Sequence, residues 1–331
     1  MSLSAVVIGC GRVGSVYDNG RAGQDPRSHA GSYAAAPGIE LVAGVDPNDE
    51  RRAAFETLWQ VPAYARVEDM LPRVRPEVWS VCTPAGPRPD LIETALSSGA
   101  RAIWAEKPLA SSAAAARTVV RRSREAGVPL AVNYPRRWDP AHIAFAEAIH
   151  RGEAGRIQHV AVRYTRGLLN YGTHAIDLLR WFVGEPSWLW AHEALDRDET
   201  DPSPVIAMGF GDGPIAALLP IDRDAHDTFE VDLIGTDARF TLRDRGATVR
   251  VERVAVDRDW SEPRVLRPAP DEFPPGLRGM MLAAVKNLMA ALLRPEELRC
   301  TGEDGLAALE IVEAVRESLR SGAAVLRSPR E

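Results

Sequence analysis

The chain has 331 residues, more than one hydrophobic core of ordinary size accommodates, so we expect two domains. Hydrophobic residues make up 45% and charged residues 26%, which is typical of a globular protein and excludes a disordered one. The formal net charge is -6 and the arginines are scattered, which argues against nucleic acid or a membrane surface as a partner.

Short apolar runs alternate with helical patterns over the first part of the chain. Such near-continuous apolar runs are typical of strands that are buried on both faces. The expected strands are Ala5–Ile8, Leu41–Val45, Val78–Thr83, Ala102–Ala105 and Pro129–Val132, with helices over Asp49–Trp59, Pro89–Ser98 and Ser112–Ala126. This alternation predicts an α/β domain with a parallel sheet over residues 1–133.

The pattern changes after residue 133, where strands follow one another with short turns. This arrangement predicts a second domain, over residues 134–331, of the α+β class with a mainly antiparallel sheet. The expected strands are Ile157–Thr165, Val205–Gly211, Pro214–Pro220, Thr228–Ile234, Arg239–Leu242 and Thr248–Val254. Helices are expected over Pro140–His150, Thr173–Val183, Gly276–Leu293 and Gly302–Ser321, and a loop over Arg258–Gly276.

The three cysteines, Cys10, Cys82 and Cys300, are few, odd in number and without metal-ligand spacing. We therefore expect neither a disulfide framework nor a metal site, and a reducing compartment. The first residues lack the basic segment of a signal peptide and run directly into a strand. No apolar run approaches the ~20 residues of a transmembrane helix, so a cytoplasmic protein is expected.

The first predicted strand ends in a glycine motif, Gly9-Cys10-Gly11-Arg12-Val13-Gly14. Gly9 allows a tight turn, Gly11 lets the backbone approach a pyrophosphate, and Gly14 lets a helix pack on the strand. The N-terminus of that helix offers N–H groups to phosphates. The motif therefore predicts a dinucleotide site of the Rossmann type, with Arg12 and Val13 beside the phosphates.

An acidic residue, Asp46, ends the second predicted strand and is placed to bind the ribose hydroxyls of NAD. Its charge would repel the 2′-phosphate of NADP, so NAD(H) is favoured as the cofactor. NADP(H) remains the alternative because Arg12, Arg51 and Arg52 lie nearby in the sequence. The stretch Tyr17–Ser32, with Asp18 and His29, is longer than the fold requires and reads as a surface insertion or as a segment that overhangs the cofactor.

The fourth predicted strand leads into Glu106-Lys107-Pro108. A lysine at the carboxyl end of a parallel strand points into the crevice where ligands bind in open α/β sheets. Pro108 fixes the turn and keeps Lys107 out of a helix.

These motifs together resemble the glucose-fructose oxidoreductase/inositol dehydrogenase/rhizopine-catabolism family, Gfo/Idh/MocA. The resemblance extends over nearly the whole chain, through Gly9–Gly14, Cys82-Thr83-Pro84, Gly99, Glu106-Lys107-Pro108, residues 133–140, Gly172–Asp177 and residues 304–314. It implies a Rossmann domain followed by an α+β domain with a large open-faced sheet. It also implies NAD or NADP, a secondary hydroxyl or ketone on a sugar, cyclitol or related polyol, and a homodimer or homotetramer.

The resemblance assigns the catalytic roles to Lys107 and His174, which line the family's substrate pocket. Lys107 is suited to stabilise a developing alkoxide and His174 to exchange its proton. Thr173 is the expected N-cap of the helix that carries His174, which would place the imidazole at the positive helix end. Thr83, Pro84, Glu106 and Lys107 are expected to contact the cofactor.

The chain departs from the family pattern at two places. Asn170 stands where many members have aspartate, so it can bond a substrate hydroxyl but cannot act as a base. Ala85 and Arg88 replace the frequent Asn and His after Thr83-Pro84, so contacts around the nicotinamide ribose are expected to be remade.

Candidate substrate contacts are Asn133, Arg137, Tyr164 and Tyr171, with Arg136 and Arg166 as further polar groups. Two alternatives to a polyol dehydrogenase are open from the sequence. One is a non-catalytic nucleotide-sensing or partner-binding member, for which Asn170 speaks. The other is a reductase of the dihydrodiol or biliverdin type.

Overall fold

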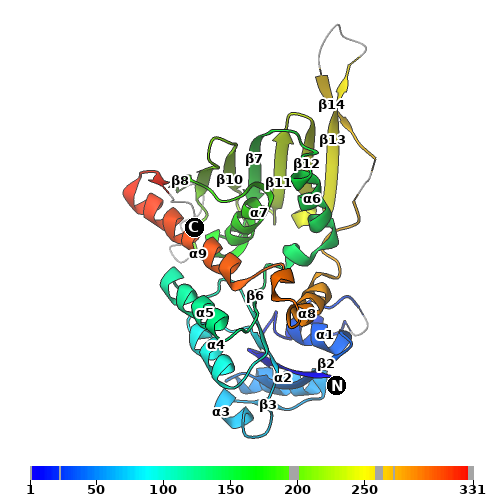
Figure 1. The fold of residues 1–331 in the computed structure, drawn as a ribbon, viewed down its shortest axis with the longest axis vertical. Helices are drawn as coiled ribbons and strands as arrows, with labels where there is room; N and C mark the ends of the chain where they lie inside the picture. Colours follow the sequence, from blue (N-terminus) through cyan, green and yellow to red (C-terminus); the bar gives the residue numbers. More distant parts are fainter. Residues whose placement is uncertain (1, 22–23, 194–200, 258–263, 271–272, 327–331) are drawn as a thin grey trace. The chain divides into compact units, whose positions relative to one another are not determined.

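A computed structural model describes residues 2–21, 24–193, 201–257, 264–270 and 273–326. The chain divides into two compact units. Unit 1 comprises Met1–Trp138 and Gly279–Leu309, and unit 2 comprises Asp139–Arg278 and Glu310–Glu331. Each unit is built on its own sheet (Figure 1).

Unit 1 contains a six-stranded sheet in the order β3-β2-β1-β4-β5-β6, and every pairing in it is parallel. The strands are β1 Leu3–Ile8, β2 Ile39–Val45, β3 Ala63–Tyr64, β4 Val78–Val81, β5 Ala102–Ala105 and β6 Leu130–Val132. The predicted parallel sheet is confirmed. The strand order reverses between β1 and β4, which opens a crevice at their carboxyl ends.

Helices cover both faces of this sheet. They are α1 His29–Ala35, α2 Asp49–Trp59, α3 Val67–Met70, α4 Arg88–Ser97, α5 Ala113–Glu125 and α8 Met280–Ala291. Asn48 and Ser112 begin α2 and α5, since their side chains accept from the N–H groups of Arg51 and Ala115. Helix α4 lies beside α5, and α8, from late in the chain, packs on α1 (Figure 1).

The helix that follows β1 is interrupted. The N–H groups of His29 and Ala30 donate to the carbonyls of Val13 and Gly14 at 2.9 and 3.0 Å, as consecutive turns of one helix would. The described residues between this first turn and α1, 15–21 and 24–28, form an insertion between the two. The glycine motif therefore opens a single helical turn, and an insertion within the long stretch noted in the sequence separates that turn from α1.

Asp18 closes this insertion. Its carboxylate accepts from the N–H groups of Arg27 and Ser28 at 2.8 and 2.9 Å, and from the Ser28 hydroxyl. A Cβ at Gly31 would lie 2.1 Å from the same carboxylate, so only glycine fits there. The result places His29 in the core of unit 1, where its exposed fraction is 0%.

Unit 2 contains a nine-stranded sheet in the order β14-β13-β12-β11-β7-β10-β9-β8-β15. The strands are β7 Ile157–Tyr164, β8 Trp188–His192, β9 Val205–Gly209, β10 Ile215–Pro220, β11 Phe229–Gly235, β12 Ala238–Arg243, β13 Thr248–Val256, β14 Arg264–Pro268 and β15 Val325–Leu326. Among the described strands of this second sheet, only β7 and β10 pair in parallel, so the predicted mainly antiparallel sheet is confirmed.

The helices of unit 2 are α6 Pro140–His150 and α7 Thr173–Val183, which lie side by side over the sheet (Figure 1). The last helix, α9 Gly302–Ser321, begins in unit 1 and ends in unit 2. The loop predicted over Arg258–Gly276 is wrong at Arg264–Pro268, which is a strand paired with β13. Residues 258–263 and 271–272 of that prediction lie outside the described residues.

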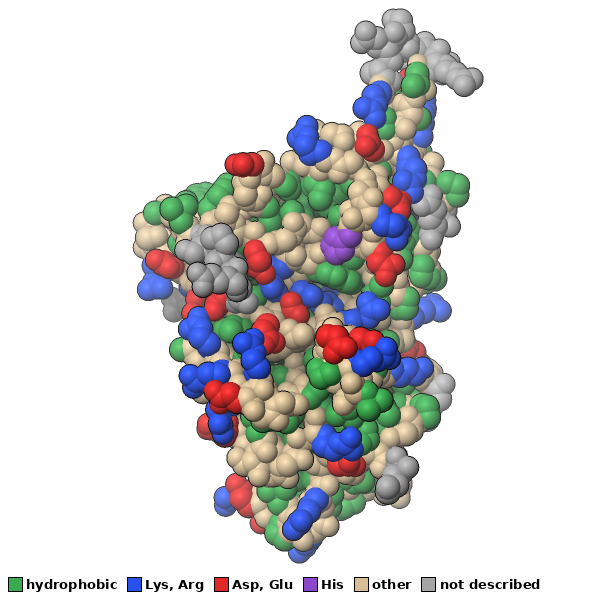
Figure 2. All heavy atoms as spheres, in the orientation of Figure 1, with side chains coloured by type: hydrophobic (Ala, Val, Ile, Leu, Met, Phe, Trp, Pro, Cys, Tyr) green, Lys and Arg blue, Asp and Glu red, His purple; other side chains and the backbone are tan. Residues whose placement is uncertain are grey.

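No helix among the described residues is long and apolar enough to cross a bilayer. On the face shown in Figure 2, the Lys and Arg side chains are interspersed with Asp and Glu side chains. That face therefore presents no continuous basic surface.

Candidate active site

A cavity of about 460 Å³ lies at the carboxyl edge of the unit 1 sheet, a size that suits a small organic ligand. It is bounded by the segments that follow β1, β2, β3 and β4. Its lining is Ile8, Gly9, Gly11, Val45, Asp46, Pro47, Arg51, Ala65, Arg66, Val67, Glu68, Cys82, Thr83, Pro84, Pro87 and Leu91.

The three glycines of the motif meet different surroundings. Gly9 has a φ of +96°, and a Cβ there would lie 2.9 Å from the Cys82 carbonyl carbon. A Cβ at Gly14 would lie 2.0 Å from the Gly9 oxygen. A Cβ at Gly11 would meet nothing within 4 Å, so the chain leaves open space at this point of the cavity. This open space fits a group that approaches the backbone closely.

The N–H groups of Gly11, Arg12 and Val13 donate no hydrogen bond to another described residue. They lie at the start of a helical turn, in which Ser15 and Val16 donate to the Gly11 carbonyl. Three unused donors at such a turn suit the oxygens of a pyrophosphate.

Asp46 is 2% exposed and follows β2 directly. Its two carboxylate oxygens accept from the N–H groups of Cys10 and Asn48, both at 2.9 Å. These bonds hold the carboxylate at the cavity wall, where a remaining lone pair can accept from ribose hydroxyls.

Two arginines also line the cavity. Arg51 places a guanidinium nitrogen 3.7 Å from an Asp46 oxygen, and Arg66 donates to Glu68 at 3.2 Å. Arg52 instead donates to the Asp46 carbonyl at 2.8 Å and is no part of this lining. The residues of the segment after β3 were missed at the sequence level, because a strand of two residues leaves no periodicity.

Arg88 ties two turns of the site together. It is buried, and its guanidinium donates to the carbonyls of Thr83 and Pro108. Burial lowers the pKa of Arg88, while the Glu106 charge opposes that effect. At one departure from the family pattern, Arg88 thus connects the turn after β4 with the turn that follows Lys107.

Glu106 and Lys107 follow β5. Glu106 is 9% exposed, and its Oε1 accepts from Nε2 of His29 at 3.2 Å and from the side-chain amide of Asn133. Burial acts to raise the pKa of Glu106, but the bonds from His29 and Asn133, together with Lys107, hold it below the usual value. Glu106 is therefore an ionised carboxylate beside the partly exposed Lys107.

Asn133, a predicted substrate contact, is buried with a side-chain oxygen that has no hydrogen-bond partner among the described residues. Its exposed fraction is 3%, and the oxygen is Oδ1. Thr83 belongs to the cavity lining, and its Oγ1 likewise has no hydrogen-bond partner among the described residues. Both atoms suit a bound ligand that donates hydrogen bonds.

The segment before His174 differs from the prediction. A π-helical turn over Leu168–Gly172 precedes α7, and Thr173 donates its hydroxyl to the carbonyls of Leu169 and Asn170. Thr173 is therefore not the N-cap. His174 lies one turn inside a longer helical run and is 8% exposed, so the positive helix end gives no argument about its protonation.

The first residues of this helical run are hydrogen-bonded to residues that lie outside the run. The Leu169 N–H donates to the Asp201 carboxylate at 2.6 Å, and the Leu168 N–H to the Pro202 carbonyl. Asn170 is exposed on the π turn. Such turns frequently occur at functional sites.

Tyr171 and Arg166 share one carboxylate. Tyr171 donates its hydroxyl to Asp227 at 3.2 Å, and Arg166 donates two hydrogen bonds to the same group at 2.7 and 2.8 Å. Burial acts to raise the pKa of Asp227, but these bonds hold it below the usual value.

Two predicted substrate contacts have other roles. Tyr164 is fully buried, and its hydroxyl donates to the Pro204 carbonyl at 2.6 Å. Arg137 is 8% exposed and pairs with Asp304 at 3.2 Å. Polar side chains at strand and helix ends often satisfy buried backbone groups and charges in this way, and a substrate contact at Tyr164 or Arg137 stays a prediction.

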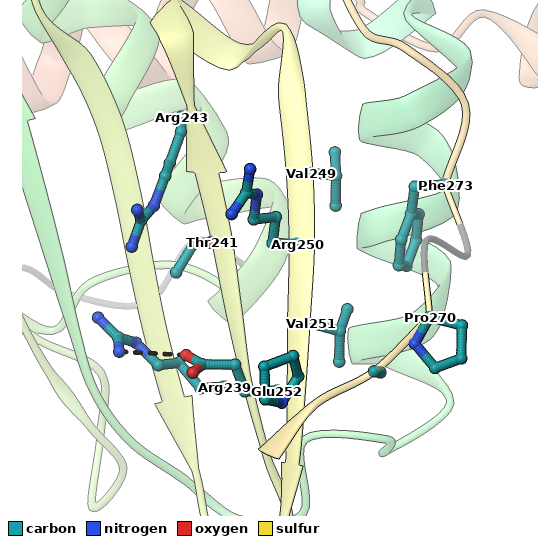
Figure 3. A pocket seen from close by; sticks show the side chains of 11 residues that line it. Arg239, Thr241, Arg243, Val249, Arg250, Val251, Glu252, Pro270 and Phe273 are labelled. Carbon is teal, nitrogen blue, oxygen red and sulfur yellow. Dashed lines mark hydrogen bonds and ion pairs between the residues drawn. The ribbon is translucent and has the colours of Figure 1, made fainter. Parts of the chain in front are cut away.

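A smaller cavity of about 200 Å³ lies on unit 2, between β12, β13, residues 268–270 and Phe273 (Figure 3). Arg239 on its wall pairs with Asp232 and Glu252 at 2.6 and 3.1 Å. It contains none of the predicted site residues. The described residues contain no group of three or more His, Cys, Asp or Glu suited to a metal ion.

Comparison with known families decides the class of protein. Residues 3–134 match the model of the oxidoreductase family with an NAD-binding Rossmann fold. Residues 163–326 match the model of that family's C-terminal alpha/beta domain. This chain belongs to the Gfo/Idh/MocA oxidoreductase family. The family description and its curated dehydrogenases make it an NAD(P)-dependent dehydrogenase.

Two curated family members are similar over most of their length. D-apiose dehydrogenase of Paraburkholderia graminis is 28% identical over 90% of this chain and 86% of its own. Inositol 2-dehydrogenase of Rhizobium meliloti is 24% identical over 96% and 97%. The dehydrogenase WlbA of Bordetella pertussis, solved with NADH and UDP-GlcNAcA, has the same fold, with a TM-score of 0.80, 20% identity and full coverage of both chains.

Proposed function

We propose that this dehydrogenase transfers a hydride between a nicotinamide cofactor and a secondary alcohol or ketone of a sugar, cyclitol or related polyol. The observation that carries the proposal is Lys107, which follows β5 on the same edge of the sheet as the dinucleotide cavity. The buried Glu106 carboxylate lies next to it. The names of the two curated relatives support a polyol as substrate.

In the proposed reaction the carbinol carbon loses its hydrogen with the electron pair, and the hydroxyl loses its proton. A bound nicotinamide cofactor supplies the hydride acceptor. The Lys107 ammonium stabilises the negative charge that develops on the oxygen. His174 takes the proton in oxidation and returns it in reduction. Asn170 cannot hold charge, so we assign it a hydrogen bond to a substrate hydroxyl.

The proposed cofactor contacts are the N–H groups of Gly11 to Val13 for the pyrophosphate and Asp46 for the adenosine ribose. Thr83 and Pro84 would lie along the nicotinamide half. NAD(H) is the favoured cofactor because Asp46 is buried at the cavity wall, and Arg51 would serve NADP(H) as the alternative. For the substrate we retain Asn133, with its orphaned oxygen, and Tyr171.

A substrate screen tests this proposal. The purified protein would be assayed for NADH or NADPH formation with D-apiose, myo-inositol, scyllo-inositol and a panel of aldoses, with glycerate and lactate as simple hydroxy-acid controls. We expect turnover of at least one polyol and none of the controls. Oxidation of the hydroxy acids alone would contradict the proposed substrate class.

A further inference from the structure

A chain of buried polar side chains lies behind Glu106. The Tyr33 hydroxyl contacts the Ser80 hydroxyl at 2.7 Å, and the Ser80 hydroxyl contacts Nδ1 of His29 at 2.8 Å. The other ring nitrogen of His29 lies 3.2 Å from Glu106 Oε1. Tyr33, Ser80 and His29 are each 0% exposed. None of these three residues belongs to the proposed mechanism.

The hydrogen bonds in this chain have one consistent direction. Burial lowers the pKa of His29, so the imidazole is neutral and carries one proton. Because Glu106 is an acceptor only, that proton belongs on Nε2, and Nδ1 accepts from Ser80. Ser80 accepts in turn from Tyr33, whose pKa burial raises. Every donor is then satisfied, and the chain runs from Tyr33 toward Glu106.

The chain ends inside the core at Tyr33, so it leads no proton to solvent. It fixes a position instead. His29 itself is held by the Trp104 ring, whose centroid lies 3.7 Å from the imidazole centroid. Both hydrogen bonds that reach Glu106 end on Oε1, and Oε2 accepts none from a described residue. Oε1 is thus held by buried side chains, and Oε2 is the oxygen that can accept from a neighbouring group.

We propose that His29 is a positioning residue of this dehydrogenase, which holds the Glu106 carboxylate ionised and in one orientation beside Lys107. The inference rests on the proposed role of Lys107. His29 lies immediately after the insertion of residues 15–28, so that insertion would serve to deliver the imidazole to the sheet. The polar or charged groups that face Glu106 are His29 from α1, Cys82 after β4, Arg88 from α4, Lys107 and Asn133.

The first test compares His29→Leu with His29→Gln. Leucine removes the donor to Glu106, so the carboxyl gains a proton at higher pH and no longer attracts the Lys107 ammonium. We expect the acidic limb of the kcat–pH profile to move up by about 1–2 units, with KM within about twofold. Glutamine retains an N–H donor and should restore part of the shift. The substrate is whichever of myo-inositol, scyllo-inositol and D-apiose the wild type oxidises fastest.

His142→Gln is the matched control. His142 is also 0% exposed and also contacts a carboxylate, Asp139 at 2.8 Å, but it lies in unit 2 and has no assigned role. It should lower the melting temperature and leave the pH profile in place. A His29→Leu variant that behaves in the same way, less stable but with an unmoved profile, would overturn the proposal.

The second test needs no turnover. Glu106 has a lowered pKa when folded, so its contribution to stability is present above the unfolded pKa of about 4.3 and is lost as the pH falls through the folded value. In His29→Leu the folded pKa rises above the unfolded one, which reverses the sign. The loss in unfolding free energy should therefore be largest at pH 7 and shrink between about pH 6 and 4.

Because His29 itself has a lowered pKa in the folded protein, the loss from His29→Leu shrinks below about pH 6.5 in any background. A Glu106→Gln background removes the contribution of the carboxylate, so there the loss at pH 7 should be smaller than in the wild-type background. An equal loss at pH 7 in both backgrounds would overturn the contact between His29 and an ionised Glu106. If Lys107→Met keeps full turnover, or no polyol is oxidised, the proposed function fails. The unfolding measurement still decides separately whether His29 holds Glu106.

Discussion

At the scale of single residues, Asp46 carries the discrimination between the two nicotinamide cofactors. Its carboxylate is fixed by two backbone N–H groups at the cavity wall, with the Arg51 guanidinium 3.7 Å away. The negative charge favours ribose hydroxyls and opposes a phosphate. Arg51 partly offsets that charge, so the preference depends on the balance between the two side chains.

Replacing Asp46 by Ala should therefore weaken NADH binding by roughly 10- to 100-fold, because hydrogen bonds to a charged group are lost. NADPH binding should change less or improve. Fluorescence titration with each cofactor measures the ratio. Asp49→Ala is the control, since Asp49 lies on the adjoining helix with its side chain 89% exposed. An unchanged NADH/NADPH ratio in Asp46→Ala would refute its assigned role.

The role of a single residue is best predicted from the sequence where that role depends on its neighbours along the chain. Asp46, Glu106 and Lys107 come directly after strands, and the parallel sheet brings all such positions to one edge. The role of a residue is predicted least well where the burial of its side chain determines that role. Tyr164 carries the same polar group as Tyr171, but its hydroxyl satisfies a buried carbonyl, which depends on contacts far away in the sequence.

At the scale of elements, the predicted helices Asp49–Trp59, Pro140–His150 and Thr173–Val183 agree with the structure at both ends. Asn48 and Asp139 accept hydrogen bonds from the first turns of α2 and α6, and such caps are readable in a sequence. The capping of the helical run before α7 was not predictable, because Asp201 supplies it from 32 residues away in the sequence.

The interrupted helix after β1 shows the same limit. The sequence indicates that the segment 17–32 is too long, but not where it leaves the helix. The outcome depends on Asp18, which closes the insertion, and on the carbonyls of Val13 and Gly14, which receive α1 as it resumes. His29, which lies in the stretch that the sequence indicates as a surface insertion or a segment over the cofactor, is thereby a core residue.

At the scale of the whole molecule, one face of the unit 2 sheet exposes apolar side chains. Trp190, Ile215 and Leu219 are 36%, 52% and 37% exposed. The pairing of β8, β9 and β10 places Trp190, Ala207 and Ala217 opposite one another. An apolar sheet face of this kind is typical of an interface between subunits.

We therefore expect a homodimer or homotetramer that uses this face. Ile215→Asp puts a charge into the proposed interface and should shift the mass measured by light scattering toward the monomer, without unfolding the chain. Val256→Asp is the control, because Val256 is a 76% exposed apolar residue on β13. In the strand order β13 lies next to β14, away from β8, β9 and β10. A wild type that is monomeric at micromolar concentration would contradict the expectation.

The central claim is that Lys107 stabilises the oxygen from which the proton leaves, and the most direct measurement is turnover of Lys107→Met with its cofactor affinity. Methionine keeps most of the side-chain length and removes the charge. We predict that kcat falls by about 100- to 1000-fold while the NADH dissociation constant stays within about threefold. A variant that binds NADH normally and oxidises its polyol at the wild-type rate would contradict the account.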